Sequence, residues 1–223
     1  MEKKIVFAEI EYPSQISGLQ AKNGKLYFRL YPEPLKYFIY DFKTLISISE
    51  TKYLSENFAT DKYFYNNTEN IVVVSENTLR YLFPEGIVRL FNRDLEILKE
   101  YPVNDTMEIC DFCIDGKGCF WITDAPFHSV SQYSIKTGEM LYKIEGGIEP
   151  TGVLNYPESI ICFDNYIYIS DMGSKRILRL EIDSKELTVY KEFDKPVWEY
   201  ARVGDKEIVK LQDGLYLLEN RGK

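Results

Sequence analysis

The sequence predicts an all-β protein, a five-bladed β-propeller of four-stranded antiparallel blades whose last blade is closed by the N-terminal strand. Three observations predict this fold. The composition suits strands, a strand-like run recurs at a nearly constant interval, and the final unit lacks one strand. Because such units complete one another only as a ring, we expect a single propeller domain over residues 1–223.

The composition favours strands over helices. Of the 223 residues, 45% are hydrophobic and 15% aromatic, with 18 Tyr and 13 Phe, a usage typical of pleated, half-buried strands. No apolar run approaches the roughly 20 residues that would cross a bilayer, and the apolar stretch at residues 5–8 is too short for a secretory signal. We therefore expect a soluble, cytoplasmic protein with no membrane partner.

The acidic charge balance and the cysteine content narrow the classes of function. A net charge of -8 gives a phosphate backbone a repulsive long-range field, so no nucleic-acid partner is expected. The four cysteines, at 110, 113, 119 and 162, lie in a chain too large to need disulfide bonds. They are interpreted as reduced, buried thiols.

The first element is a spare strand, residues 4–11, which ends in Tyr12-Pro13. The last repeat unit supplies only three strands, at residues 197–203, 207–211 and 215–219. If the N-terminal strand completes that unit, the ring closes with no blade left unpaired, which limits the exposed strand edges. A β-sandwich with long loops is the alternative, but it does not explain the matching fragments at the two ends.

Between these ends, one short apolar run marks each unit. Its centres at residues 27, 73, 121 and 168 are 46, 48 and 47 residues apart, and a shorter fifth unit follows at 207–211. Each run is followed by a second run, a polar turn and a last strand, which predicts four antiparallel strands joined by hairpins. The last strands of the first four units are predicted at residues 45–49, 95–100, 140–144 and 187–193.

The fourth unit resembles the NHL repeat of propeller proteins. It contains Tyr-Pro-Glu-Ser-Ile at 156–160, a strand ending in Asp171, and Arg176-Ile177. The third unit matches in part, since it keeps Trp-Ile-Thr-Asp at 121–124 but has Val-Ser-Gln at 130–132 in place of the Arg-Ile pair. NHL propellers commonly have six blades, so five is a departure. The resemblance implies a binding platform, in which Asp171 and Arg176 form a structural pair that fixes a hairpin.

Two patterns could carry catalysis or metal binding. His128 is the only histidine, but its neighbour Ser129 would point to the opposite face of a strand, so His128 is interpreted as a surface loop residue rather than a general base. Cys110 and Cys113 have CxxC spacing. Residues three apart on a strand face opposite sides, which favours small core residues over a zinc or redox site.

A third pattern appears when the units are superposed. Glu158 and Glu199 align near the start of the innermost strand, and Glu108 joins them if one residue is inserted. That position borders the central channel, where three carboxylates could bind a hard divalent metal ion. The alternative is that Glu108, Glu158 and Glu199 are solvated carboxylates at strand ends.

Aromatic residues near the predicted loops are candidate anchors for a partner. Trp198, Tyr200, Phe127 and Tyr31 lie close to loops or to the starts of inner strands, and exposed aromatic side chains often carry the binding energy of an interface. The alternative for each is packing between blades. The sequence alone does not separate these two roles.

The predicted function is a non-enzymatic binding scaffold that presents one propeller face to a protein or peptide, or to a small ligand. A monomer without a cofactor is expected, and no residue is assigned a catalytic role. The alternative is a metal-dependent hydrolase or lactonase-like enzyme that uses a divalent metal ion at Glu108, Glu158 and Glu199. Fold alone does not decide between them.

Overall fold

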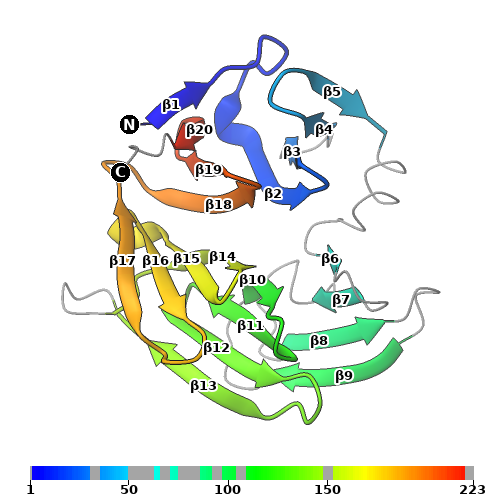
Figure 1. The fold of residues 1–223 in the computed structure, drawn as a ribbon, viewed down its shortest axis with the longest axis vertical. Coiled ribbons are helices and arrows are strands. Elements are labelled where there is room, and N and C mark those ends of the chain that lie inside the picture. Colours follow the sequence, from blue (N-terminus) through cyan, green and yellow to red (C-terminus); the bar gives the residue numbers. More distant parts are fainter. Residues whose placement is uncertain are drawn as a thin grey trace.

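The protein forms four-stranded antiparallel sheets arranged around a common centre (Figure 1). The computed structural model describes residues 2–30, 36–49, 63–65, 71–74, 86–91, 97–103, 109–147 and 153–218. Five such sheets occur among these residues, each with its strands paired in the order of a blade. The prediction of an all-β propeller with four-stranded antiparallel blades is therefore confirmed.

The strands follow one another from the centre outward within each sheet. The first sheet holds β2 (Ile16–Lys22), β3 (Lys25–Leu30), β4 (Lys36–Tyr40) and β5 (Leu45–Ile48). The second holds β6 (Tyr63–Tyr65), β7 (Ile71–Val74), β8 (Gly86–Phe91) and β9 (Ile97–Val103). The third holds β10 (Ile109–Ile114), β11 (Cys119–Asp124), β12 (Ser129–Ser134) and β13 (Met140–Glu145).

The fourth and fifth sheets complete the set. The fourth holds β14 (Pro157–Phe163), β15 (Tyr166–Asp171), β16 (Arg176–Glu181) and β17 (Leu187–Glu192). The fifth holds β18 (Val197–Val203), β19 (Lys206–Leu211), β20 (Gly214–Leu218) and β1 (Glu2–Ile5). Each apolar run that marks a unit in the sequence lies on the second strand of its sheet. In Figure 1 the strands β2, β6, β10, β14 and β18 surround the centre of the molecule.

The N-terminal strand closes the fifth sheet, as predicted. β1 pairs antiparallel with β20, with Glu2 opposite Leu218 and Ile5 opposite Leu215. The strand overlaps the predicted residues 4–11 only at Lys4 and Ile5, because its pairing with β20 starts at Glu2 and ends at Ile5 opposite Leu215. The chain then turns, and a short 3-10 helix, η1 (Pro13–Gln15), leads into β2.

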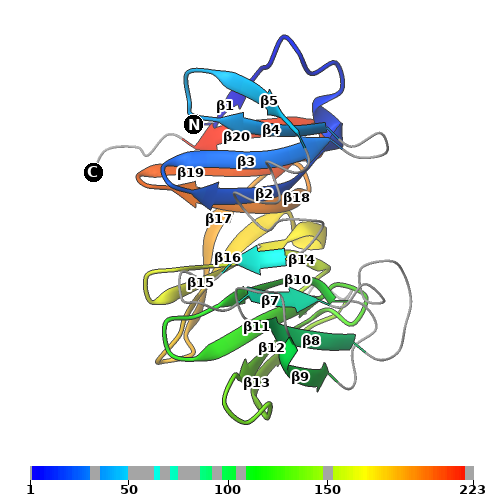
Figure 2. The ribbon, with the colours of Figure 1, turned by 90° about the vertical axis from the view of Figure 1, so that its right-hand side faces the viewer.

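The apolar cores lie between neighbouring sheets, so each sheet depends on the next one. The core between the first and fifth sheets contains Phe7 and Ile10 from the turn after β1 together with Phe28 and Ile208. Trp121, Ile169 and Leu180 are part of the core between the third and fourth sheets. Figure 2 shows β2–β5 and β18–β20 together at one end of the molecule and β10–β13 at the other. Within the described residues, no helix is long and apolar enough to cross a membrane.

Candidate functional site: the loop face

One edge of the sheets carries the loops between the second and third strands and the loops that lead from one sheet to the next. We call this edge the loop face. Backbone hydrogen bonds join its loops: Gly173 N–H donates to Asn155 O at 2.8 Å, and Gly146 N–H donates to His128 O at 2.9 Å. The loops of the third and fourth sheets therefore form one connected surface.

Asp171 holds the loops of the fourth sheet together. Its side chain is fully buried, accepts a hydrogen bond from Asn155 N–H at 2.6 Å, and pairs with Arg176 Nε at 2.7 Å. Arg176 Nη2 also donates to the carbonyl of Val153 at 2.9 Å. The predicted Asp171–Arg176 pair is confirmed, but Asp171 contacts the loop that precedes the sheet rather than the turn that follows it.

His128 is buried rather than exposed, which corrects the interpretation of it as a surface loop residue. Its Nδ1 accepts a hydrogen bond from Tyr156 N–H at 3.0 Å, and its ring packs edge-on against Tyr156 with centroids 4.5 Å apart. Its backbone is left-handed, at a φ of 51°. The side chain therefore links the third and fourth sheets, and this contact occupies the nitrogen that a general base would use.

Exposed apolar side chains gather on the loop face. Phe127 lies between β11 and β12, Tyr156 just precedes β14, and Trp198 lies in β18; these side chains are 47%, 38% and 39% exposed. Tyr12 and Val153 are also exposed in loops of this face. We call these five residues the apolar rim. Large exposed apolar groups that share one face are typical of binding surfaces.

The other aromatic candidates have different positions. Tyr200 is only 2% exposed and packs between the fourth and fifth sheets beside Tyr168, with ring centroids 5.4 Å apart. Tyr200 follows Trp198 by two residues on β18, and residues two apart on a regular strand share a face. The bulge of β18 between Val197 and Glu199 breaks this regularity, so Trp198 is exposed while Tyr200 is buried. Tyr31 lies outside the described residues.

Glu199 joins the fifth sheet to the first. Its Oε1 accepts a hydrogen bond from Gly18 N–H at 3.1 Å, and its Oε2 accepts one from Leu19 N–H at 2.6 Å. These amides lie in a bulge of β2, where the register with β3 shifts between Ser17 and Gln20. The carboxylate thus satisfies backbone donors that the bulge removes from the ladder.

Lys210 complements Glu199 at the same junction. It lies opposite Glu199 in the β18–β19 ladder, and its ammonium donates to the carbonyls of Ser14 and Ile16 at 2.8 and 2.5 Å. Burial lowers the pKa of Lys210, while the charge of Glu199 opposes this shift. Two side chains of the fifth sheet thus bind the backbone at the start of the first sheet. Glu199 accepts its N–H groups, and Lys210 donates to its carbonyl groups.

Asp111 makes the corresponding contact between the third and fourth sheets. Its Oδ2 accepts a hydrogen bond from Ile160 N–H at 3.0 Å. Ile109 pairs with Asp124 and Val197 with Leu211, and both inner strands bulge at the next residue. Asp111 and Glu199 therefore occupy equivalent positions.

The predicted channel residues are not equivalent in the structure. Pro157 pairs with Asp171 before the bulge of β14, so Glu158 corresponds to Trp198, and Ser159 corresponds to Glu199. Glu158 is partly buried near the start of β14, and Glu108 lies outside the described residues. Within the part of the chain that is described, no group of three or more His, Cys, Asp or Glu side chains could hold a metal ion. The metal site stays a prediction.

The four cysteines are free thiols. Cys113 and Cys119 are buried, as predicted, whereas Cys110 and Cys162 are partly exposed. Burial, assisted by nearby carboxylates, raises the pKa of Cys113 well above its usual range and that of Cys162 to about 11. These two thiols therefore stay protonated near neutral pH, which makes them poor nucleophiles and poor metal ligands.

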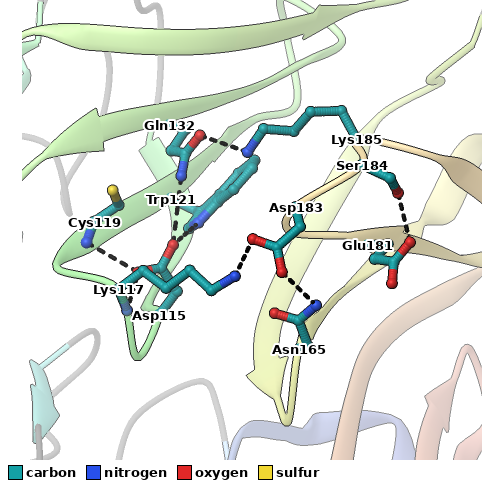
Figure 3. A network of polar contacts seen from close by, with 10 residues as sticks. All are labelled: Asp115, Lys117, Cys119, Trp121, Gln132, Asn165, Glu181, Asp183, Ser184 and Lys185. Atoms are coloured by element: carbon teal, nitrogen blue, oxygen red, sulfur yellow. Dashed lines mark hydrogen bonds and ion pairs between the residues drawn. The ribbon is translucent and has the colours of Figure 1, made fainter.

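Sequence reasoning missed Asp111 and the buried Asp115. Asp115 is 4% exposed and accepts hydrogen bonds from Trp121 Nε1 at 2.9 Å and from the backbone of Cys119 at 3.0 Å (Figure 3). The available signal for Asp111 was an acidic residue near the start of an inner strand, two residues after Ile109, as Glu199 is two residues after Val197. An Asp before a Gly-Lys-Gly turn was the signal for Asp115.

Comparison with solved structures identifies the same fold in proteins of different roles. The WD40 β-propeller domain of Doa1 has a TM-score of 0.57 at 12% identity, over 93% of this chain and 64% of that domain. A catalytically inactive virginiamycin B lyase from Staphylococcus aureus with quinupristin has a TM-score of 0.57 at 9% identity, over 97% of this chain and 98% of the lyase. Myxococcus xanthus glutaminyl cyclase has a TM-score of 0.54 at 8% identity, over 98% of this chain and 93% of the cyclase.

These likenesses show a β-propeller and do not extend to activity. The neighbours include a WD40 domain and two enzymes, and identities near 10% carry the fold alone. The chain spans 57% of the length of the computationally designed Ika8 protein and 64% of that of the Doa1 domain. No protein-family model matches the chain, and no curated protein matches its sequence.

Proposed function

We propose that the protein is a non-enzymatic binding scaffold whose loop face holds a protein or peptide partner. The observation that carries the proposal is the apolar rim, which comes from loops of the third and fourth sheets, from the start of β18 in the fifth, and from the segment after β1. Exposed aromatic groups supply large contact area at low entropic cost, and this makes them effective anchors.

The loops beneath the rim are held in place before any partner binds. Buried Asp171 and His128 bond to the backbone of the segment that carries Val153 and Tyr156. A surface whose loops are already ordered loses less conformational entropy on binding. This arrangement supports a docking surface, and the bond from Tyr156 N–H to Nδ1 gives His128 a structural role in it.

The architecture behind this proposal is a five-bladed ring. The five sheets, the placement of their first strands around one centre (Figure 1) and the closure of the last sheet by β1 support that number. The Asp171–Arg176 pair supports an NHL-like fourth blade. WD40 domains among the structural neighbours are consistent with a scaffold role.

A comparative capture experiment tests the loop face. The protein, immobilised, is exposed to extract of its native cell beside the double variant Phe127→Ser/Trp198→Ser. The control is Ile46→Ser/Val189→Ser, which removes two equally exposed apolar side chains from the outer strands β5 and β17. We expect the parent and the control to retain the same partner and the loop-face variant to lose it. Loss in the control, or retention in the loop-face variant, would contradict the proposal.

The metal-dependent enzyme is the rival function, and metal analysis of the purified protein separates the two. A stoichiometric divalent ion that is lost in Glu158→Gln, while the fold stays intact, would favour the enzyme. The expected result for a scaffold is no stoichiometric metal after dialysis. The occupied carboxylate of Glu199 supports this expectation, because its two oxygens already accept backbone amides.

A further inference from the structure

An aromatic cage lies between the third and fourth sheets, at the edge opposite the loop face. Trp121 of β11, Tyr142 of β13 and Gln132 of β12 surround the ammonium of Lys185. Figure 3 shows Lys185 reaching from the β16–β17 turn to Trp121 and Gln132. Lys185 Nζ lies 4.7 Å from the Trp121 ring centroid, 5.1 Å from that of Tyr142, and 2.8 Å from Gln132 Oε1. These distances are typical of cation–π binding.

Asp115 fixes the geometry of the cage from behind. Its Oδ2 accepts hydrogen bonds from Trp121 Nε1 at 2.9 Å and from Gln132 Nε2 at 3.4 Å. The first bond sets the position of the indole ring, and the second turns the amide so that its oxygen faces the cation. A buried carboxylate close to the cage also makes it more favourable for positive charge. The cage is thus built from the third sheet alone and does not depend on Lys185 for its shape.

Lys185 is not the residue that its turn prefers. Lys185 N–H donates to Glu181 O at 3.0 Å, and in the equivalent β12–β13 turn Gly138 N–H donates to Ser134 O at 2.8 Å. Both residues are left-handed, with φ of 59° for Lys185 and 81° for Gly138. Glycine adopts this conformation without the steric cost that a side chain brings. The contacts of its side chain give a reason for lysine at this position that the turn itself does not give.

A primary ammonium fits the cage incompletely. It carries three N–H donors, and among the described residues Gln132 Oε1 is its one hydrogen-bond acceptor. Burial in this position lowers the pKa of Lys185, which records the cost of removing the charged group from water. A quaternary ammonium has no N–H groups to satisfy and is weakly hydrated, so the same aromatic walls suit it better.

We propose that the Trp121–Tyr142–Gln132 cage is a binding site for a quaternary ammonium group, and that Lys185 is its intramolecular plug. The group could belong to a free choline-like molecule or to a trimethylated lysine of a partner protein. The plug leaves by rotation of its own side chain from a turn whose tip, Asp183 and Ser184, is exposed. The net charge of -8 attracts cations to the protein.

Fluorescence titration tests the site. Trp198→Phe leaves Trp121 as the single tryptophan, since the chain has two. In this background, Lys185→Gly removes the plug and gives the turn the residue found at 138, and Lys185→Asn is the second plug-free variant because Asn tolerates a left-handed backbone. Tetramethylammonium is titrated at constant ionic strength against sodium chloride. Choline and a trimethyllysine peptide, with its unmethylated counterpart, are titrated in the same way.

The expected result is a saturable change in Trp121 emission in the plug-free variants, at a concentration at least about tenfold below that needed with Lys185 present. With Lys185 present, only the small fraction of molecules whose cage is open can bind the ligand. The apparent Kd equals the intrinsic Kd divided by that fraction, so removing the plug lowers it. Adding Tyr142→Leu should abolish the change while circular dichroism shows an intact fold. Tighter binding of the peptide than of choline would assign the group to a partner protein, and the reverse would assign it to a small molecule.

Three outcomes would overturn the proposal. These are the absence of a saturable change in folded Lys185→Gly or Lys185→Asn, equal affinity with and without the plug, and binding that survives Tyr142→Leu. The loop-face variants are independent of this site, so failure here leaves the scaffold proposal standing.

Discussion

Two buried tyrosine hydroxyls show how much depends on one hydrogen bond. Tyr101, 2% exposed, donates from its hydroxyl to Ile135 O at 2.5 Å. Tyr200 is equally buried, and its hydroxyl has no hydrogen-bond partner among the described residues. Burial, with the charge of Glu207 as a second cause, raises the pKa of Tyr200 well above its usual range. The two residues form a matched pair for mutation.

Replacing each tyrosine by phenylalanine should have opposite effects. Tyr101→Phe removes the hydrogen bond from the buried tyrosine to the part-buried carbonyl of Ile135 and should destabilise the protein by about 1–2 kcal/mol. Tyr200→Phe removes an unpaired buried group and should be neutral or stabilising by up to about 1 kcal/mol. Urea unfolding of both variants measures the difference. An equal loss in Tyr200→Phe would indicate that an ordered water or a ligand satisfies that hydroxyl.

At the scale of elements, Asp213 binds the closing strand to its sheet. It lies in the β19–β20 turn and accepts hydrogen bonds from Lys4 at 3.0 Å, Lys195 at 2.9 Å and Tyr216 at 2.9 Å. Burial alone would raise the pKa of Asp213, but the hydrogen bonds from Lys195, Lys4 and Tyr216 outweigh it and hold the pKa well below the usual 3.8.

The lowered pKa predicts how stability depends on pH. Because the folded state binds this proton more weakly than the unfolded state, the contribution of Asp213 is fully present above the unfolded pKa and is lost as pH falls through the folded one. The difference in unfolding free energy between the parent and Asp213→Asn should be constant from about pH 5 to 7 and should shrink below about pH 4. Urea midpoints between pH 2 and 7 measure it. A difference that stays constant down to pH 2 would contradict the assignment.

Removal of residues 1–12 tests the closing strand itself. The deletion unpairs β20 and takes Phe7 and Ile10 out of the core between the first and fifth sheets. Burial of two large side chains contributes several kcal/mol, so the melting temperature should fall by at least about 10 °C, and the open edge should promote aggregation. A monomeric deletion variant with an unchanged melting temperature would show that β1 is dispensable.

At the scale of the whole molecule, charge decides which partners can approach. With a net charge of -8, single-stranded RNA or duplex DNA should show no detectable binding at physiological salt, because the field opposes the phosphate backbone. Fluorescence anisotropy with labelled oligonucleotides at about 150 mM salt measures this. Submicromolar binding of an oligonucleotide would contradict this prediction and would indicate a local cluster of lysines that outweighs the repulsion from the net negative charge.

The whole-molecule fold was largely predictable because its signals are local and repeated. Alternation of apolar residues and polar turns marks each strand, and the second strand of every sheet lies on a predicted run. The three-stranded C-terminal unit and the spare N-terminal strand together predicted closure. The bounds of β1 were not predictable, because they depend on its pairing with β20, which runs from Glu2 opposite Leu218 to Ile5 opposite Leu215.

The candidate site was predictable only in part. Phe127 and Trp198 are exposed on the loop face, as the interpretation of aromatics near loops required, whereas Tyr200 is buried. His128 is buried because a loop from the next sheet supplies Tyr156 N–H. A contact between residues 28 positions apart leaves no pattern in either segment.

By itself, the sequence determined the class of fold, the four-stranded antiparallel blades and the closing role of the N-terminal strand, because strand periodicity and turn chemistry are properties of neighbouring residues. Only the tertiary structure decided what each polar side chain does. Pro157 and Val197 are equivalent and both strands bulge directly after them, so Glu158 matches Trp198 and lies one residue away from the position of Glu199, which a simple alignment of the runs had paired with it. Likewise, Lys185 reaches the cage of the third sheet only because the fourth sheet packs beside it, and no local pattern around residue 185 predicts that contact.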